Sequence, residues 1–362
     1  MHEYKLDDIF DIKSPFSLDK DSKKDIFVEH MNKLSHHHRQ NCSQYNSIVS
    51  GLGFAKGAST LEDVPYIPVR LFKLLDLVSV GNKEIFKKMM SSGTSGQAVS
   101  KIYLDKVTAS RQSAVLRSIM GDFLGSKRLP MMVVDTDDII KNRNEFNARA
   151  AGILGFSIFG RDHSYSLDSD MIAKLDSINR FIAAHSERGI FLFGFTFIIW
   201  QFLYRYSKEI SIPLEFGNNS ILLHGGGWKK LVDQSVSNKI FKREMSSQLG
   251  ITRVHSYYGM VEQTGSIYVE CERGFLHSSV YSDVIVRDPI SFEPCDFNEP
   301  GIIQVLSVIP TSYPGHSLLT EDEGVIFGED DCLCGRRGKY FTVFGRMKGA
   351  EARGCSDTRQ IL

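Results

Sequence analysis

The chain has 362 residues, of which 42% are hydrophobic, enough to bury one large core or two medium-sized ones. Basic and acidic residues number 43 each, so the net charge is zero, which argues against a nucleic acid or an anionic membrane as main partner. The N-terminus has no apolar signal-peptide core, and the longest apolar stretch, residues 189–203, is too short and mixed to span a bilayer. We therefore expect a cytoplasmic protein whose six cysteines are thiols or metal ligands.

The first part of the chain has the pattern of helices. Within residues 1–50, Phe27, Met31 and Leu34 recur at helical spacing, which predicts one apolar face. The three histidines at 36–38 follow directly, and we expect them on a solvated surface, with metal binding as the alternative.

Further along, extended segments alternate with helical patterns. Residues 61–73 contain two prolines and read as an extended crossing segment. Residues 131–134 and 221–223 are strand-like apolar runs, and residues 189–203 read as a buried strand that runs into a helix. This alternation predicts an α/β fold built in layers.

Two glycine-rich turns are candidates for ligand binding. The first combines two glycines with four hydroxyl side chains, a composition that lets backbone N–H groups and hydroxyls surround phosphate oxygens; it consists of Ser91, Ser92, Gly93, Thr94, Ser95 and Gly96. Taken alone, it is equally consistent with a flexible linker. The second turn, Gly225, Gly226 and Gly227, follows a strand-like run and offers bare backbone to a flat ligand such as adenine. Its alternative is a structural turn in which Trp228 packs inward.

Three later motifs complete a set. They are Tyr258-Gly259 with Glu262, then Asp322, then Arg346, and in this order after the Ser/Gly loop they resemble the nucleotide-binding set of the adenylate-forming enzymes. The resemblance implies that Thr94 and its loop hold phosphates and that Tyr258 stacks on adenine. It also implies that Glu262 meets Mg²⁺, that Asp322 bonds the ribose hydroxyls and that Arg346 contacts ribose or phosphate.

A closer resemblance covers most of the chain. The Ser/Gly loop, Gly-Gly-Gly-Trp-Lys at 225–229, Thr-Ser-Tyr-Pro at 311–314 and Arg-Gly-Cys at 353–355 resemble the LuxE-type acyl-protein synthetases of the bacterial bioluminescence fatty-acid reductase system. Tyr-Gly-Met-Val-Glu at 258–262 and the Cys-Leu-Cys-Gly-Arg stretch resemble phenylacetate-CoA ligases instead. These resemblances imply a large α/β N-terminal adenylate-forming domain of the acyl-CoA synthetase type, over residues 1–344.

The adenylate-forming superfamily usually continues for about a hundred residues beyond its Gly-Arg hinge, whereas only sixteen residues follow Arg346 here. We therefore expect a short tail, residues 345–362, in place of the usual C-terminal domain. In the resembled synthetases a cysteine near the C-terminus carries the fatty acyl group, and Cys355 matches that place. Thiolates attack acyl-adenylates readily, and Arg353 and Arg359 favour the thiolate form. The alternative is a free surface thiol.

The remaining cysteines suggest a structural zinc site. Cys271 and His277 are separated by five residues, and Cys332 and Cys334 by one, so two segments together supply four zinc ligands. Buried thiols and a surface histidine are the alternative, whereas Cys42 and Cys295 have no partner at ligand spacing.

The sequence thus predicts an ATP- and Mg²⁺-dependent acyl-protein synthetase, with Thr94, Glu262 and Cys355 as catalytic residues. It would activate a carboxylic acid, expected to be a fatty acid, as acyl-AMP and transfer the acyl group to Cys355, for delivery to a partner reductase that the resemblance implies. Two alternatives stay open: a ligase that acylates CoA or a carrier protein, and a non-catalytic adenylate-binding scaffold.

Overall fold

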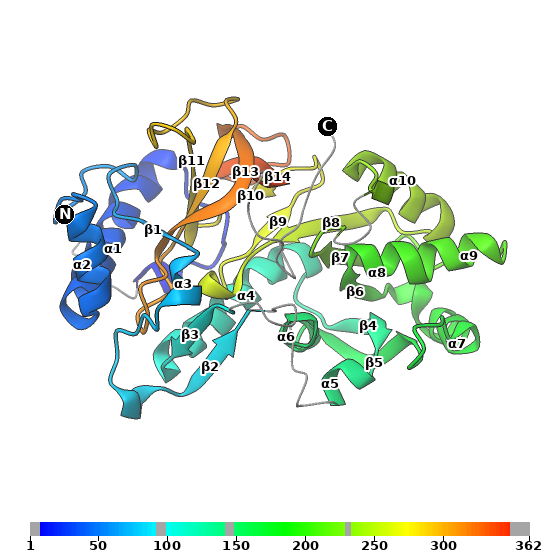
Figure 1. Ribbon diagram of the computed structural model, residues 1–362. Coiled ribbons are helices and arrows are strands. Elements are labelled where there is room, and N and C mark those ends of the chain that lie inside the picture. The colour runs from blue at the N-terminus through cyan, green and yellow to red at the C-terminus, as the bar shows by residue number, and fades with distance from the viewer. Residues whose placement is uncertain (1–7, 92–98, 142–147, 229–232, 348–362) are drawn as a thin grey trace. The chain divides into compact units, whose positions relative to one another are not determined.

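The computed structural model describes residues 8–91, 99–141, 148–228 and 233–347 (Figure 1). Within these ranges the chain forms two compact units, and both contain helices and strands. The first unit comprises residues 8–122, 259–268 and 275–347, and the second comprises residues 123–258 and 269–274. The predicted α/β fold is confirmed.

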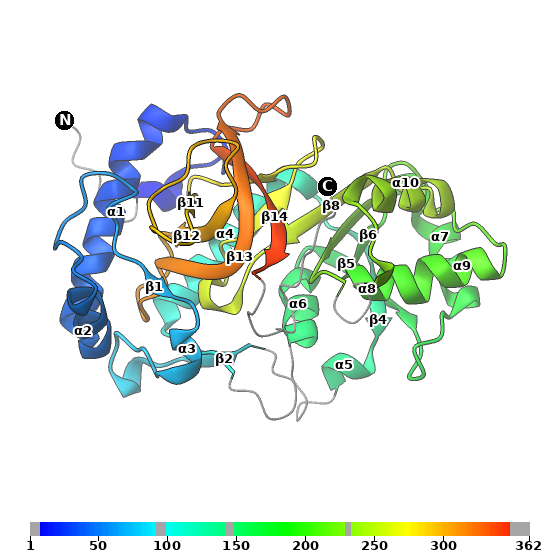
Figure 2. The ribbon, with the colours of Figure 1, turned by 45° about the horizontal axis from the view of Figure 1, so that its top comes forward.

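The first unit combines N-terminal helices with a mainly antiparallel sheet. Strands β11, β12, β13, β14 and β10 are neighbours in that order and antiparallel, whereas β1 joins β13 in parallel (Figure 2). A separate antiparallel pair is formed by β2 and β3. The helices are η1 (Asp8–Asp11), α1 (Lys20–Asn41), α2 (Ser43–Gly51), α3 (Leu71–Leu74), η2 (Asn82–Glu84), α4 (Lys106–Leu124) and η7 (Val261–Gln263). The strands are β1 (Ile67–Pro68), β2 (Lys87–Met90), β3 (Lys101–Leu104), β10 (Leu276–His277), β11 (Ser282–Arg287), β12 (Gly301–Ser307), β13 (Ser317–Glu329) and β14 (Lys339–Arg346). Strand β9 (Tyr268–Glu270) begins with the last residue of a first-unit segment and otherwise belongs to the second unit.

Helix α1 follows the predicted pattern. Its N-cap is Asp19, whose carboxylate accepts a hydrogen bond from the backbone N–H of Ser22 at 2.9 Å, satisfying one of the free donors of the first turn. Phe27, Met31 and Leu34 are all buried, as their spacing predicts.

A buried charge cluster ties α1 to the sheet. The carboxylate of Asp283 on β11 lies 2.7 Å from Nζ of Lys23 on α1 and 3.0 Å from Nζ of Lys339 on β14. All three side chains are buried. Burial alone would raise the pKa of Asp283, but the two ammonium groups outweigh it and lower the pKa to about 2. Removing either lysine would leave the buried charge of Asp283 poorly compensated. A single substitution in this cluster therefore destabilises the fold.

The prediction that the three histidines at 36–38 lie on a solvated surface is wrong for His38. Only His36 is exposed, whereas His38 is fully buried. Its Nδ1 lies 2.8 Å from Ser79 Oγ, its Nε2 lies 3.2 Å from the Pro310 carbonyl oxygen, and its ring stacks on His316 with centroids 4.9 Å apart. These partners satisfy both ring nitrogens, which makes burial of a polar ring tolerable.

The second unit is built on a parallel sheet in the order β8-β7-β6-β4-β5. Its strands are β4 (Leu129–Thr136), β5 (Gly160–Leu167), β6 (Phe191–Phe195), β7 (Ile221–Gly225) and β8 (Arg253–Tyr258). Its helices are α5 (Asp138–Lys141), α6 (Ala148–Ser157), α7 (Leu175–His185), η4 (Ser186–Arg188), α8 (Thr196–Ile198), η5 (Ile199–Tyr204, a π-helix), α9 (Arg205–Glu209) and α10 (Asn238–Leu249). Nowhere in the described ranges is a helix long and apolar enough to cross a membrane.

The predicted strands and their surroundings agree with this sheet. Residues 131–134 lie in β4, residues 221–223 lie in β7, and the stretch 189–203 is strand β6 followed by helix, as expected. Strands β6 and β7 are buried at every residue, which is typical of a parallel sheet whose faces are both covered. Helices flank these strands (Figures 1 and 2).

Buried histidines predict loss of stability in acid. Burial lowers the pKa of His38 well below 6.5 and lowers the pKa values of His316 and His224 to about 3. Below pH 6.5 these histidines bind protons in the unfolded chain but not in the folded chain. The free energy of unfolding is therefore highest above pH 6.5 and falls as the pH drops toward 3. Chemical denaturation at several pH values measures this change.

The variant His38→Gln should flatten the dependence of the unfolding free energy on pH between 7 and 5. The variant His36→Gln, which changes an exposed neighbour, should leave that dependence as in the wild type. A wild-type unfolding free energy that stays constant from pH 7 to pH 5 would contradict this explanation.

Candidate functional site

The Ser/Gly loop is closed at its base by a pair of serines. Ser91 donates its backbone N–H to the Ser100 carbonyl oxygen at 3.0 Å, and Ser91 Oγ accepts the Ser100 N–H at 2.8 Å. These bonds hold the two ends of the loop together directly after β2 and before β3. Residues 92–96, including Thr94, lie outside the described residues.

The glycine turn at 225–227 continues from the end of β7 in the second unit. A Cβ on Gly225 would lie 2.6 Å from Cε1 of Tyr257, so only glycine admits this ring against the backbone. Gly226 and Gly227 adopt φ of 77° and 60°, values that glycine reaches without strain. The following Trp228 is buried and packs edge-on against Trp200, with centroids 5.2 Å apart, so it anchors the turn. Trp228 thus packs inward as the structural alternative predicts, and the three glycines before it are buried.

Glu262 is held in a short helical turn of the first unit. It lies in η7 and is buried, as is its neighbour Gln263. The Gln263 side-chain amide donates to the Val305 carbonyl oxygen at 3.0 Å and to the Gly315 carbonyl oxygen at 2.8 Å, which fixes this turn against β12. A Cβ on Gly315 would lie 2.6 Å from the Glu262 carbonyl oxygen, so a glycine is needed at this close approach.

The structure adds Tyr313 to this group. Its side chain is fully buried, and burial, followed by the nearby charge of Glu262, raises the pKa of its phenol. Tyr313 therefore stays protonated at neutral pH. It belongs to the Thr-Ser-Tyr-Pro motif, yet no spacing in the sequence indicated that it would lie near Glu262. Tyr258, at the end of β8 in the second unit, is also buried.

Asp322 and Arg346 lie opposite each other. They are register partners on β13 and β14, and Asp322 Oδ1 lies 3.9 Å from Arg346 Nε. Arg346 Nη1 also lies 3.5 Å from Glu321 Oε2, and the Asp322 backbone N–H donates to Thr320 Oγ1 at 3.1 Å. Asp322 is buried. The pairing thus places a carboxylate and a guanidinium, separated by 23 residues in the sequence, side by side at the end of one ladder.

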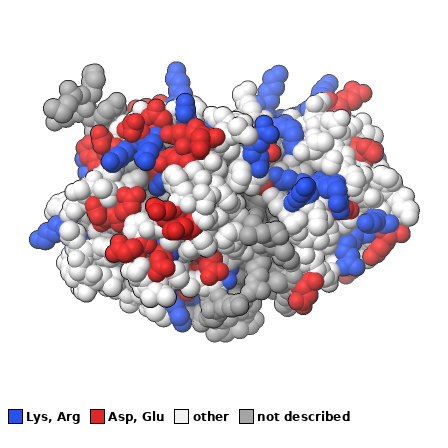
Figure 3. Space-filling view, turned by 90° about the horizontal axis from the view of Figure 1, so that it is seen from above, with Lys and Arg blue, Asp and Glu red and all other residues white. Residues whose placement is uncertain are grey.

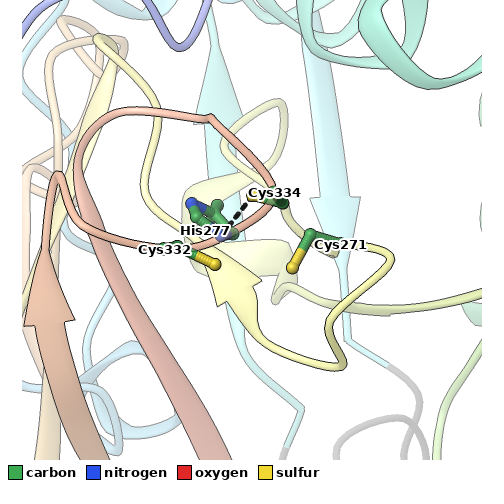
Figure 4. Close-up of side chains that lie close together, drawn as sticks. All are labelled: Cys271, His277, Cys332 and Cys334. Carbon is green, nitrogen blue, oxygen red and sulfur yellow. Dashed lines mark hydrogen bonds between the residues drawn. The ribbon is translucent and has the colours of Figure 1, made fainter.

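The four predicted zinc ligands gather in one place. Their donor atoms all lie within 4.8 Å of one another, and Cys271, His277 and Cys332 are buried while Cys334 is half-buried. Figure 4 shows the loop with Cys332 and Cys334 beside the strand that carries His277, and Cys334 Sγ lies 3.3 Å from His277 Nε2. Three thiols and one imidazole are a donor set that fits tetrahedral zinc.

Backbone amides support the same sulfurs. The Arg273 N–H donates to Cys271 Sγ at 3.4 Å, and the Arg336 N–H donates to Cys334 Sγ at 3.5 Å. Such bonds orient the sulfur ligands, as outer-shell contacts do in zinc sites.

Cys355 lies outside the described residues, which end at Met347. The last of them is held in place, because the Met347 N–H donates to the Glu321 carbonyl oxygen at 3.0 Å. The role of Cys355 therefore stays a prediction from the sequence.

We expect the cysteine-histidine cluster to bind about one zinc ion per chain in protein purified without chelators. Replacing one ligand, as in Cys332→Ser, should lower both the zinc content and the melting temperature, since the remaining donors hold the metal less tightly. Metal analysis and thermal denaturation provide the two readouts.

The matched control is Cys295→Ser, a half-exposed cysteine outside the cluster. It should keep the zinc content of the wild type. Wild-type protein without zinc, together with an unchanged melting temperature in Cys332→Ser, would rule out a structural metal at this cluster.

Comparisons with known proteins place the chain in a family. A family model described as acyl-protein synthetase, LuxE, matches residues 2–360. A long-chain-fatty-acid–luciferin-component ligase of Vibrio harveyi is 22% identical over 360 residues, covering 97% of this chain and 92% of the relative. A protein of the same name from Aliivibrio fischeri is 21% identical over 329 residues, covering 89% and 84%.

The fold is also that of adenylate-forming ligases. A crystal structure of 2-hydroxyisobutyryl-CoA ligase in the postadenylation state superimposes with a TM-score of 0.72 at 16% identity, covering 96% of this chain and 72% of that one. An open conformation of the same ligase gives 0.69 and covers 93% and 78%. With the family match over nearly the whole sequence, the chain belongs to the acyl-protein synthetase (LuxE) family and is a ligase.

Proposed function

We propose that this protein is an ATP-dependent acyl-protein synthetase that activates a fatty acid and carries the acyl group on Cys355. The family match over residues 2–360 is the observation that carries the proposal, and the adenylate-forming fold supports acyl activation by ATP. The names of the two curated relatives support a long-chain fatty acid as the substrate class.

In the first step a carboxylate oxygen of the acid attacks the α-phosphorus of ATP, and pyrophosphate leaves. The Ser/Gly loop, tied at its base by Ser91 and Ser100, is suited to bind the departing phosphates through Thr94. Asp322 would accept hydrogen bonds from the ribose hydroxyls, and Arg346 beside it would contact ribose or phosphate oxygens. The glycine turn 225–227 and Tyr258 are the proposed adenine site.

Mg²⁺ would neutralise charge that develops on the phosphates. Hard cations prefer oxygen ligands, and Glu262 offers a carboxylate in a turn that Gln263 and Gly315 hold in place. Burial keeps this carboxylate away from competing bulk water, which strengthens its interaction with a cation. Its donor type therefore fits the role that the resemblance implies.

In the second step the Cys355 thiolate attacks the acyl carbonyl carbon, and AMP leaves with the electron pair of the broken C–O bond. The product is a thioester on the protein. We propose residues 1–344 as the adenylation domain and residues 345–362 as a tail that delivers Cys355. The eight residues that follow Met347, up to Cys355, span roughly 28 Å when extended.

The acyl group would then pass to a partner reductase. The names of both relatives include a luciferin component, which supports such a partner. A location in the cytoplasm stays a prediction from the sequence.

A second candidate is transfer of the acyl group to CoA. The favouring observation is the resemblance of residues 258–262 and of the Cys-x-Cys stretch to phenylacetate-CoA ligases. Both candidates share the adenylation step and differ only in the acceptor thiol.

Removing a group that acts on the nucleotide should abolish most adenylate formation. Thr94→Ala, Glu262→Ala and Asp322→Ala should each lower the rate of ATP–pyrophosphate exchange about a hundredfold, since lost electrostatic stabilisation of this kind costs about 3 kcal/mol. The control is Glu323→Gln, an exposed acid next to Asp322 on the same strand, which should retain exchange. Exchange at the wild-type rate in both Thr94→Ala and Glu262→Ala would refute the assignment.

The acceptor is tested by Cys355→Ser. This variant should still form acyl-AMP, because the adenylation groups lie elsewhere, but it should not retain an acyl label that neutral hydroxylamine removes. A serine hydroxyl is the weaker nucleophile, and an oxygen ester reacts more slowly with hydroxylamine.

The companion variant Cys295→Ser should keep the full hydroxylamine-sensitive label. If Cys355→Ser keeps it as well, or if the wild type acylates CoA with no protein-bound intermediate, Cys355 is a bystander and the CoA ligase is the better description.

A further inference from the structure

A cavity of about 270 Å³ lies inside the first unit. None of the residues that line it belongs to the proposed acyl-activation site or to the cysteine-histidine cluster. The first turn of α1, strand β11 and the adjoining ends of β13 and β14 contribute its walls.

The charges that line the cavity are mainly positive. Four lysines face three carboxylates, and the lysines are Lys20, Lys23, Lys24 and Lys339. Lys20 and Lys24 are exposed at the start of α1, whereas Lys23 and Lys339 are buried.

The two buried ammonium groups share one carboxylate. Lys23 Nζ donates to Asp283 and to the Ser282 carbonyl oxygen, both at 2.7 Å. Lys339 Nζ donates to Asp283 and to the Val284 carbonyl oxygen, both at 3.0 Å. An ammonium group has three donors, and each of these two uses two of them on oxygen acceptors of the described chain. Lys23 Nζ also lies 5.0 Å from the centroid of the Phe27 ring.

A second carboxylate that lines the cavity belongs to Glu329. Glu329 is half-buried, and burial raises the pKa of its carboxyl, which favours the neutral form. The remaining lining carboxylate, Glu62, is exposed. The two buried ammonium groups share the single fully buried carboxylate of Asp283, so this part of the lining carries more positive than negative charge, which is costly to bury without an anionic partner.

Most of the remaining lining residues are apolar. Leu61, Ile285, Ile326 and Phe297 contribute hydrocarbon surface to the cavity. Figure 3 shows more acidic than basic side chains over the first unit on that face of the molecule, a surface charge that disfavours the approach of a polyanion such as a nucleotide. A ligand that fits both features has one negative charge and an apolar chain.

We propose that this cavity binds a monocarboxylate with a short apolar chain, its carboxylate meeting Lys23 and Lys339 and its chain lying against the apolar wall. The proposal does not depend on the proposed function, since none of the residues of that site takes part. It adds a second carboxylate site to the chain.

Cys295 lines the cavity, so the rate at which its thiol is alkylated reports whether a ligand occupies the cavity. In the full-length protein without ATP, octanoate should slow alkylation of Cys295 by iodoacetamide at least about threefold at saturation, as measured by peptide mass spectrometry. Octan-1-ol and inorganic phosphate should leave the rate unchanged, because one lacks the charge and the other lacks the chain. No slowing by octanoate, or equal slowing by either comparison compound, would overturn the proposal.

A double variant tests the charges without disturbing the buried pair. Lys20→Gln/Lys24→Gln should raise the octanoate concentration for half-maximal protection about threefold to tenfold, as expected for the loss of two exposed cations near an anion. Lys33→Gln changes a lysine of the same helix that does not line the cavity and should leave this concentration unchanged. An unchanged concentration in the double variant would contradict a carboxylate bound beside the start of α1, where the proposal places it.

Discussion

The pairing of β13 with β14 positions residues of two functional clusters, the Asp322–Arg346 pair and the cysteine-histidine cluster. Its register puts Asp322 opposite Arg346 at one end. At the other end the connection between the two strands carries Cys332 and Cys334, while β14 pairs with β10 and thereby brings His277 into place. A slip of one residue would turn every side chain of a strand to the other face of the sheet, so the carboxylate-guanidinium pair depends on this register.

Strand β14 of this ladder also supplies one of the two lysines of the buried charge cluster. Lys339, at the start of β14, meets Asp283 on β11 and so links this strand to Lys23 on α1. Such a cluster stabilises little in total, because desolvation of three charges opposes their attraction. It does specify which segments pack together. Its excess positive charge is also what makes the neighbouring cavity suitable for an anion.

Local patterns in the sequence were sufficient for much of the fold. The apolar spacing of Phe27, Met31 and Leu34 identified α1, and the apolar run at 221–223 identified β7. The spacings Cys-x5-His and Cys-x-Cys predicted two half-sites, and the structure brings their donors together. These features succeed because each is encoded within a few residues of chain.

Features that depend on distant contacts were not predicted. His38 looked like part of a polar surface run, but its partners Ser79, Pro310 and His316 are supplied by segments far along the chain. The Tyr257 ring against Gly225 was missed for the same reason, although the glycine itself indicated a close approach. The cavity combines residues of α1, β11 and β14, and no local spacing relates them.

Covalent capture of an activated acid is the central claim, and intact-protein mass spectrometry tests it most directly. The protein would be incubated with Mg²⁺-ATP and a panel of fatty acids of different chain length. The account predicts an ATP-dependent mass increase equal to one acyl group in place of one hydrogen, lost again on treatment with neutral hydroxylamine. An unchanged protein mass while acyl-AMP accumulates, or while added CoA becomes acylated, would contradict it.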